Sequence, residues 1–168
     1  MTAQNGAAEV VSVNVSERKT VRKTPGKAGE LELDRGFVGD AHAGDWHRQV
    51  SLLALESIDK MRAAGLDVGP GDFAENITTR GIDLLSLPVG TRVKIGPEVE
   101  LEVSQIGKVC HTKCAIFYQA GDCVMPKEGI FAVVRVAGPV SVGDEVRVLS
   151  LGDGACDRVP ADARAEPL

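Results

Sequence analysis

The clearest alternation of apolar and polar residues lies at positions 91–104. Apolar residues alternate with Arg or Lys before Gly96-Pro97 and with Glu after it. Successive side chains of a strand point to opposite faces, so this pattern predicts a hairpin with one apolar and one charged face. A three-residue connection at 96–98 pairs Ile95 with Val99 and sets Arg92 opposite Glu102, whereas a two-residue turn would mix the faces.

Other short apolar runs, rich in β-branched residues and bounded by Gly or Pro, predict further strands. The strands predicted in this way span residues 10–15, 48–53, 130–136 and 145–149. Several short strands with frequent turns favour a mainly β fold, a small, partly closed β-barrel with a few short helices.

One helix is predicted over residues 54–64. Leu55, Ile58 and Met61 recur at helical spacing and would share one face. Gly65 is placed to end the helix, because glycine readily adopts the left-handed conformation that follows many helices.

Length and composition predict one domain with tails. The 168 residues suit a single core over 9–149, flanked by flexible tails at 1–8 and 150–168. The net charge of −5 argues against a general nucleic-acid binder. No run approaches the roughly 20 apolar residues of a membrane span, and residues 1–8 do not resemble a signal peptide. We therefore expect a cytoplasmic protein with no nucleic-acid or membrane partner, whose cysteines are thiols or ligands rather than disulfides.

Three of the four cysteines cluster just after the predicted hairpin. Cys110, Cys114 and Cys123 lie within 14 positions. If a short helix begins near Cys110, then Cys110 and Cys114 share a face as an i, i+4 pair, with Cys110 at the positive end of the helix dipole.

The neighbours of Cys110 favour its ionised form. Lys108, His111 and Lys113 surround it in the sequence. A downward pKa shift of about 1.5 units would make the thiol mostly thiolate near neutral pH, and it requires only about 2 kcal/mol. In a functional interpretation, this segment carries a reactive thiolate or a soft-metal ligand. In a structural interpretation, its cysteines are small buried hydrophobic residues.

Two further functions are open for the same segment. Cys110, His111, Cys114 and Cys123 could together bind zinc or an iron–sulfur cluster as a non-enzymatic module, although the usual CxxC pairs are missing. A reversible Cys110–Cys114 disulfide would instead make the protein a redox sensor.

A glycine-rich loop at 36–48 is the second candidate site. It holds two of the three histidines, the single Trp46, and Arg48. Small residues let a ligand approach the backbone, while His, Asp and Arg side chains supply polar contacts. The alternative is an ordinary connection in which Trp46 covers the core.

A basic run follows the first predicted strand. Its members are Arg18, Lys19, Arg22, Lys23 and Lys27. Five cations in ten residues of an acidic protein indicate an anionic, phosphate-bearing ligand, although many such runs are simply solvated surfaces. The polar turn 74–79 offers further hydrogen-bonding groups but fits no motif.

In their order and spacing these segments resemble the MOSC domain, the carboxy-terminal module of molybdenum-cofactor sulfurases, which also occurs in small stand-alone bacterial proteins. The similarity covers about residues 9–149. The phrases that carry it are GFVGDAHAG (36–44), RQVSLLALESI (48–58), GDFAENITTRGIDLLSLPVGTRVKIG (71–96), LEVSQIGKVCHTKCAIF (101–117) and GDCVMPKEGIFAVV (121–134).

The resemblance implies a barrel-like, strand-rich fold that binds the molybdenum cofactor (molybdopterin). Its sulfur-handling cysteine matches Cys110, which would accept sulfur as a persulfide or bind the metal. Gly39, Asp40 and His42 match a Gly-Asp and His loop that lines the pocket.

Further expectations about ligands and partners follow from this resemblance. Arg22, Lys23 and Lys27 are expected to contact the pterin phosphate or another oxyanion. We expect no pyridoxal-phosphate domain in this chain, so a cysteine desulfurase would supply sulfur in trans and a molybdoenzyme is a possible recipient. Exposed strands make a homodimer plausible.

Overall fold

The computed structural model describes residues 8–18, 22–107 and 127–160. Most elements in these ranges are strands, together with the helix α1 (Leu55–Ala63) and the short 3-10 helix η1 (Leu84–Ser86). The strands are β1 (Glu9–Val15), β2 (Thr24–Gly26), β3 (Ala28–Glu32), β4 (Gly36–Phe37), β5 (Val50–Ala54), β6 (Ile77–Arg80), β7 (Arg92–Ile95), β8 (Val99–Ile106), β9 (Ile130–Val136), β10 (Gly138–Ser141) and β11 (Val146–Ser150). The predicted mainly β class is confirmed.

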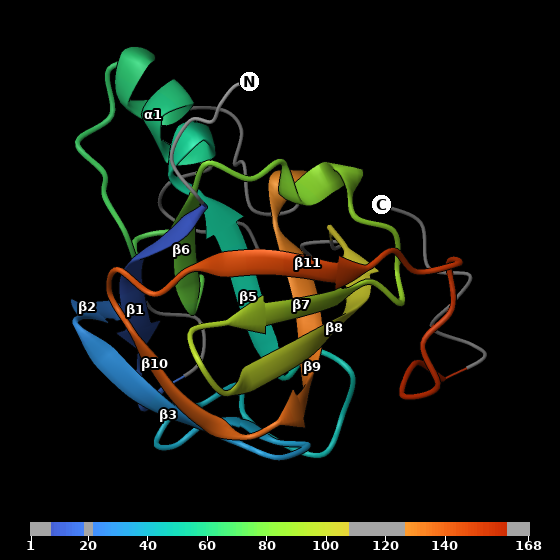
Figure 1. The fold of residues 1–168 in the computed structure, drawn as a ribbon. Coiled ribbons are helices and arrows are strands. Elements are labelled where there is room, and N and C mark those ends of the chain that lie inside the picture. The colour runs from blue at the N-terminus through green and yellow to red at the C-terminus, as the bar shows by residue number, and fades with distance from the viewer. Residues whose placement is uncertain (1–7, 19–21, 108–126, 161–168) are drawn as a thin grey trace.

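The strands form two sheets (Figure 1). The larger sheet has the order β11-β7-β8-β9-β5-β6-β1-β2, and the smaller one has the order β10-β3-β4. All neighbours are antiparallel except β5 and β6. The sheets are not closed into a barrel. Within the described ranges, an isolated bridge from Glu9 to Glu145 links the first strand to the residue before β11.

The predicted hairpin is confirmed in its register. In β7 and β8, Arg92 pairs with Glu102, Val93 with Leu101, Lys94 with Glu100, and Ile95 with Val99. The apolar members face the core, and on the other face Arg92 Nε lies 3.2 Å from Glu102 Oε1. The period of two and the three-residue connection therefore suffice to determine this element.

The predicted helix is confirmed as α1. Ile58 and Met61 are buried, and Gly65 follows the helix with φ +102°, in the left-handed region that favours glycine. The buried face of α1 packs on the larger sheet against Leu53 and Phe131, in a second core separate from the main one.

The predicted strands match β1, β5, β9 and β11 to within two residues at each end. Strands β2, β3, β4, β6 and β10 were not predicted. They are two to five residues long, and β2 and β10 contain Pro and Gly, which are depleted in strands. Strand β6 lies in the polar turn, where the apolar pattern is weak.

The main core fills the space between the two sheets. Leu31, Phe37 and Val140 from the smaller sheet meet the inward side chains of the larger one, among them Leu101 and Val134. A face-to-face arrangement of this kind buries the alternate residues of each strand, as the sequence pattern requires.

Residues 151–160, which the sequence assigns to the carboxy-terminal tail, pack on the domain in this structure. Cys156 and Val159 are buried against Val133 of β9, and Arg158 Nε donates to Asp34 Oδ1 at 2.8 Å. The predicted domain limits stay a prediction. Among the described residues, α1 and η1 are both too short to cross a membrane.

Candidate functional site

The glycine-rich loop connects β4 to β5. Gly39 has φ +83°, which favours glycine, and it turns the chain so that the following residue, Asp40, points inward. Asp40 Oδ1 accepts a hydrogen bond from Ser16 N at 3.1 Å, and Oδ2 accepts one from His42 N at 3.2 Å. The Asp40 carboxylate thus attaches the loop to the end of β1.

Lys23 and Asp40 form a buried ion pair beneath this loop. Lys23 Nζ lies 2.7 Å from Asp40 Oδ1, and both side chains have no exposed surface. The same ammonium lies 3.0 Å from Nδ1 of His42. An ammonium group can only donate, so Nδ1 is the acceptor and the ring proton of a neutral His42 lies on Nε2. The hydrogen bond from Lys23 therefore fixes the orientation of the His42 ring.

The backbone of Lys23 is held by a glycine from another segment. Lys23 N donates to Gly71 O at 2.8 Å, and Gly71 has φ +88°. A Cβ at Gly71 would lie 2.3 Å from the Lys23 carbonyl oxygen, so a larger residue would displace Lys23. This contact ties the position of Lys23 to the segment that precedes β6.

Burial and hydrogen bonding act in opposite directions on Asp40. Burial favours the neutral carboxyl, but the hydrogen bonds from Lys23 and from Ser16 N outweigh it, and the pKa of Asp40 lies below its ordinary value. Asp40 is therefore ionised near neutral pH, as the pairing with an ammonium requires.

Arg48 is held between two aromatic side chains. Its guanidinium carbon lies 4.7 Å from the centroid of the Trp46 ring and 5.7 Å from that of Phe131 on β9. Trp46 is itself fixed, because Nε1 donates to the carbonyl oxygen of His42 at 2.8 Å. The His42 and Arg48 positions are thus connected through Trp46.

The loop also contacts the end of β8. His47 Nε2 lies 2.9 Å from Gln105 Oε1, and the Gln105 side-chain amide donates to Gly107 O at 2.7 Å. Gly107 N in turn donates to Gly129 O at 2.7 Å. These bonds bring the glycine-rich loop to the point where the chain leaves β8 toward the cysteine segment.

The cysteine segment itself lies outside the described residues. This applies to Cys110, His111, Cys114 and Cys123, and to Lys108 and Lys113. Their predicted roles, and the zinc, iron–sulfur and disulfide alternatives, stay predictions.

The basic run divides into inward and outward members. Lys23 is buried, whereas Arg18, Arg22 and Lys27 are exposed. Arg22 Nη1 lies 3.5 Å from Asp72 Oδ1. The Lys23 ammonium is enclosed by Asp40 and His42. Of the described cations in the basic run, the exposed Arg18, Arg22 and Lys27 are therefore the ones accessible to an anion in solution.

Sequence reasoning missed a buried polar network around Glu75. Glu75 Oε2 accepts hydrogen bonds from Thr78 Oγ1 at 2.7 Å and Gly71 N at 3.0 Å, and Asn14 Nδ2 donates to Glu75 O at 3.1 Å. Glu75 Oε1 is buried and has no hydrogen-bond partner in the described part of the chain, and burial raises the pKa of the carboxyl. In the sequence, the polar turn 74–79 indicates hydrogen-bonding groups at this place. Nothing in the sequence shows that its side chains are buried.

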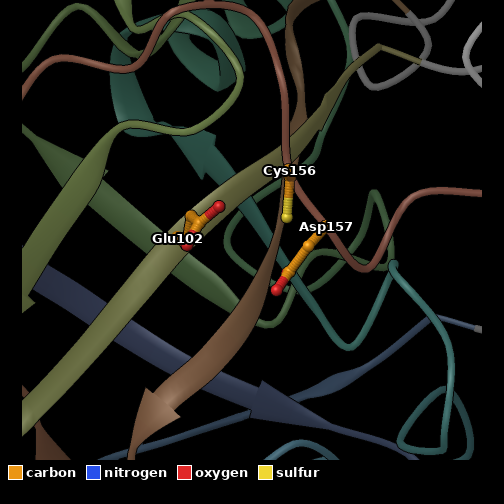
Figure 2. Close-up of side chains that lie close together, drawn as sticks. All are labelled: Glu102, Cys156 and Asp157. Atoms are coloured by element: carbon orange, nitrogen blue, oxygen red, sulfur yellow. The ribbon is translucent and has the colours of Figure 1, made fainter.

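Among the described residues, one group of possible metal ligands includes Glu102 of β8. Figure 2 shows Glu102 of β8 close to Cys156 and Asp157, whose ligand atoms all lie within 4.8 Å of one another. Arg135 already occupies this group: its Nε lies 3.0 Å from Glu102 Oε1, and its Nη2 pairs with Asp157. Burial raises the pKa of Cys156, so this thiol is neutral near pH 7. The Arg135 guanidinium therefore balances the charges of the Glu102 and Asp157 carboxylates.

A cleft of about 340 Å³ opens between α1 and the segment after β6. Ser57 and Lys60 on α1 both donate to Glu128 Oε1, at 2.6 and 3.0 Å, and Glu56 accepts from Gly81 N. These contacts join the cleft wall to the residues that follow the cysteine segment.

The fold is a mainly β domain whose glycine-rich loop contacts the end of β8, after which the chain continues in sequence into the cysteine segment. The family model of the MOSC domain matches residues 39–147, well over half of the chain. The chain belongs to the MOSC domain family, which supports a role related to the molybdenum cofactor. A search of curated proteins finds no match to this sequence.

Solved structures share the fold. The YuaD protein from Bacillus subtilis is similar with a TM-score of 0.72 and 19% identity, covering 85% of this chain and 96% of that one. YiiM from Geobacillus stearothermophilus gives a TM-score of 0.63 at 19% identity, covering 85% and 75%. YiiM from Escherichia coli gives 0.60 at 20% identity, covering 94% and 76%. At these identities the likeness concerns the fold alone.

Proposed function

We propose that this MOSC protein binds the molybdenum cofactor, or a precursor of it, and handles its sulfur through Cys110. The observation that carries the proposal is the family match over residues 39–147, which includes most of the glycine-rich loop and the whole cysteine segment. The bound cofactor would supply a metal that favours sulfur ligands and a pterin that ends in a phosphate.

The described residues fit an anionic ligand at the end of β8. Arg48 Nε is a buried donor that has no acceptor among the described residues, and an anionic group would satisfy it. Asp40 and Lys23 neutralise each other, so this pair adds no net charge to the site and instead orients His42.

Chain connectivity supports a thiol near these groups. Cys110 stands three residues after Gly107 in the sequence, and three residues span at most about 11 Å. A reactive cysteine at this position is therefore within reach of the end of β8, where His47 and Gln105 meet.

The sulfur step uses a protein persulfide as donor, supplied in trans by a cysteine desulfurase. The Cys110 thiolate attacks the outer sulfur of the donor persulfide, a new S–S bond forms at Cys110, and the old S–S bond breaks to leave the donor as a thiolate. Electrons and atoms balance without an external oxidant or reductant. Lys108, His111 and Lys113 favour the attacking thiolate in this proposal.

The test compares two cysteine variants of the full chain. After incubation with a cysteine desulfurase and free cysteine, we expect Cys110→Ala to lose cyanide-releasable sulfur and cofactor retention while its circular dichroism spectrum is unchanged. Cys156→Ala is the matched control, because Cys156 is buried beside Arg135 and should not affect sulfur loading. Equal sulfur loading in Cys110→Ala and the native protein would remove the proposed role of Cys110.

The oligomeric state is part of the proposal. Strands β11 and β2 end the larger sheet, and Leu149 near the edge is 44% exposed. A homodimer would cover such an edge. Light scattering during gel filtration at micromolar concentration distinguishes a dimer from a monomer.

A further inference from the structure

The segment 151–160, which follows β11, takes a fixed path along the residues that precede β7. Gly152 N donates to Thr91 Oγ1 at 3.0 Å, and Gly154 N donates to Val89 O at 2.9 Å. A Cβ at Gly152 would lie 2.2 Å from Val89 O, so this close approach requires glycine. These backbone contacts hold the segment on the domain.

Arg158 of this segment bridges two carboxylates. Its Nε lies 2.8 Å from Asp34 Oδ1, and its Nη2 pairs with Asp45. Asp34 follows β3, and Asp45 lies in the glycine-rich loop after β4. A guanidinium presents its donors in a planar fork, so one arginine can hold two carboxylates at once. Arg158 therefore fixes two points of the chain, one before β4 and one after it, relative to each other.

A buried amide extends this contact to the backbone of the loop. Gln49 is fully buried, and its Nε2 donates to Asp34 Oδ1 at 2.7 Å and to Trp46 O at 2.9 Å. Its Oε1 accepts a hydrogen bond from Val134 N of β9 at 2.9 Å. The hydrogen bond from Gln49 lowers the pKa of Asp34, and Arg158 lowers it further although burial opposes them. The carboxylate that joins Gln49 to Arg158 is therefore ionised near neutral pH.

These contacts restrain Trp46. Asp45 directly precedes it in the chain, and Gln49 binds its carbonyl oxygen. The Trp46 side chain in turn holds two other members of the loop: Nε1 donates to His42 O, and the ring lies against the guanidinium of Arg48. A change at Asp45 or Gln49 should therefore reach the side chains of the candidate site through Trp46.

The effect of Arg158 should be local rather than global. The Asp45 side chain is 83% exposed, and an exposed ion pair contributes little to the stability of a fold. Surface loops, in contrast, open at a low free-energy cost and depend on the contacts that restrain them. Loss of Arg158 should therefore loosen the glycine-rich loop while the two sheets stay intact.

We propose that Arg158 is a positioning residue of the candidate site. Through Asp34 and Asp45 it holds the glycine-rich loop in the conformation described above. The segment 151–160, which the sequence assigns to a tail, thus serves the site. The consequence for ligand binding rests on the proposed function, whereas the effect on the loop rests on contacts within the chain alone.

The experiment compares Arg158 variants of the full chain by the signals of Trp46, its single tryptophan. In Arg158→Gln we expect a changed near-ultraviolet circular dichroism signal and an acrylamide quenching constant that rises at least about twofold, because the loop opens more readily. Arg158→Lys should lie between Arg158→Gln and the native protein, since an ammonium keeps the charge but lacks the fork that holds both carboxylates. Far-ultraviolet spectra and thermal melts show that the variants fold.

Asp157→Asn is the matched control. It removes an ion pair of the same segment, with Arg135 of β9, and leaves the bridge made by Arg158 in place. The Trp46 signals of this variant should be those of the native protein. Native-like signals in Arg158→Gln, or an equal change in Asp157→Asn, would overturn the proposal.

Cofactor retention tests the consequence for binding separately. After anaerobic incubation with molybdenum cofactor and gel filtration, Arg158→Gln should retain less cofactor than the native protein, and Asp157→Asn should retain as much. Equal retention by Arg158→Gln would overturn the positioning role in binding. A native protein that retains no cofactor would instead contradict the proposed function. The Trp46 comparison, which needs no ligand, would still decide whether Arg158 positions the loop.

Discussion

The Lys23 ammonium and the Asp40 carboxylate lie 2.7 Å apart, from Nζ to Oδ1, and neither side chain reaches solvent. The pair joins the basic run to the glycine-rich loop, two segments that the sequence presents as separate candidate sites. Because Lys23 also donates to His42 Nδ1, the pair sets the orientation of a histidine at the end of the sheet.

We expect Asp40→Leu to reduce the free energy of unfolding by about 3–5 kcal/mol, because it leaves the Lys23 cation buried without a counterion. The double variant Lys23→Met with Asp40→Leu should be less destabilised than Asp40→Leu alone. Urea denaturation of the native, single and double variants measures the coupling. Arg35→Ala, which removes an exposed pair with Glu32, is the control and should cost no more than about 0.5 kcal/mol. Additive effects at Lys23 and Asp40 would contradict a coupled buried pair.

The same ion pair makes the protein sensitive to acid. The pKa of Asp40 is lowered in the folded state, so its contribution to stability is present above the unfolded value of about 3.9 and is lost as the pH falls through the folded-state pKa. The melting temperature of the native protein should therefore decrease as the pH falls below about 4. The decrease should be smaller in the double variant of Lys23 and Asp40, and parallel curves would show that other carboxylates dominate.

Glu75 should have the opposite dependence on pH. Its folded-state pKa is raised by burial, so its favourable contribution is present below the unfolded value of about 4.3 and is lost as the pH rises through the folded-state pKa. Glu75→Gln removes this titration and keeps an oxygen to accept from Gly71 N and Thr78 Oγ1. Urea unfolding at pH 5 to 8 should show the variant gaining stability relative to the native protein as the pH increases. A difference that does not change with pH would contradict a buried titrating carboxyl.

Cys156 should be unreactive in the native protein. It is 2% exposed, and burial raises the pKa of its thiol. In a variant that keeps only this cysteine, with Cys110, Cys114 and Cys123 changed to Ala, an aromatic disulfide reagent at pH 8 should react about 100-fold more slowly than with a free thiol. Full reactivity should return in urea. Fast labelling of the folded variant would show that the segment around Cys156 opens readily.

The local elements could be predicted because their causes are local. The register of β7 and β8 follows from the alternation around Gly96-Pro97, and α1 follows from Leu55, Ile58 and Met61 with Gly65 after them. Strand β6 could not be predicted in the same way. Its ITTR sequence carries little apolar pattern, and it becomes a strand by pairing in parallel with β5 and antiparallel with β1.

The candidate site shows the same division. The sequence indicates which side chains are chemically capable, including Lys23, Asp40, His42 and Arg48, and the order of the segments identifies the MOSC family. It does not show that Lys23 turns inward while Arg22 next to it stays exposed, because both are cations in one polar run.

By itself the sequence determined the mainly β class, the hairpin register, the helix and the family, since these depend on the spacing of neighbouring residues along the chain. Only the tertiary structure decided that Lys23 pairs with Asp40 and that Arg48 contacts both Trp46 and Phe131. The physical reason is that burial and pairing of a charge depend on residues far apart in the chain. Their approach is settled by how the two sheets and the loops pack, not by any local pattern.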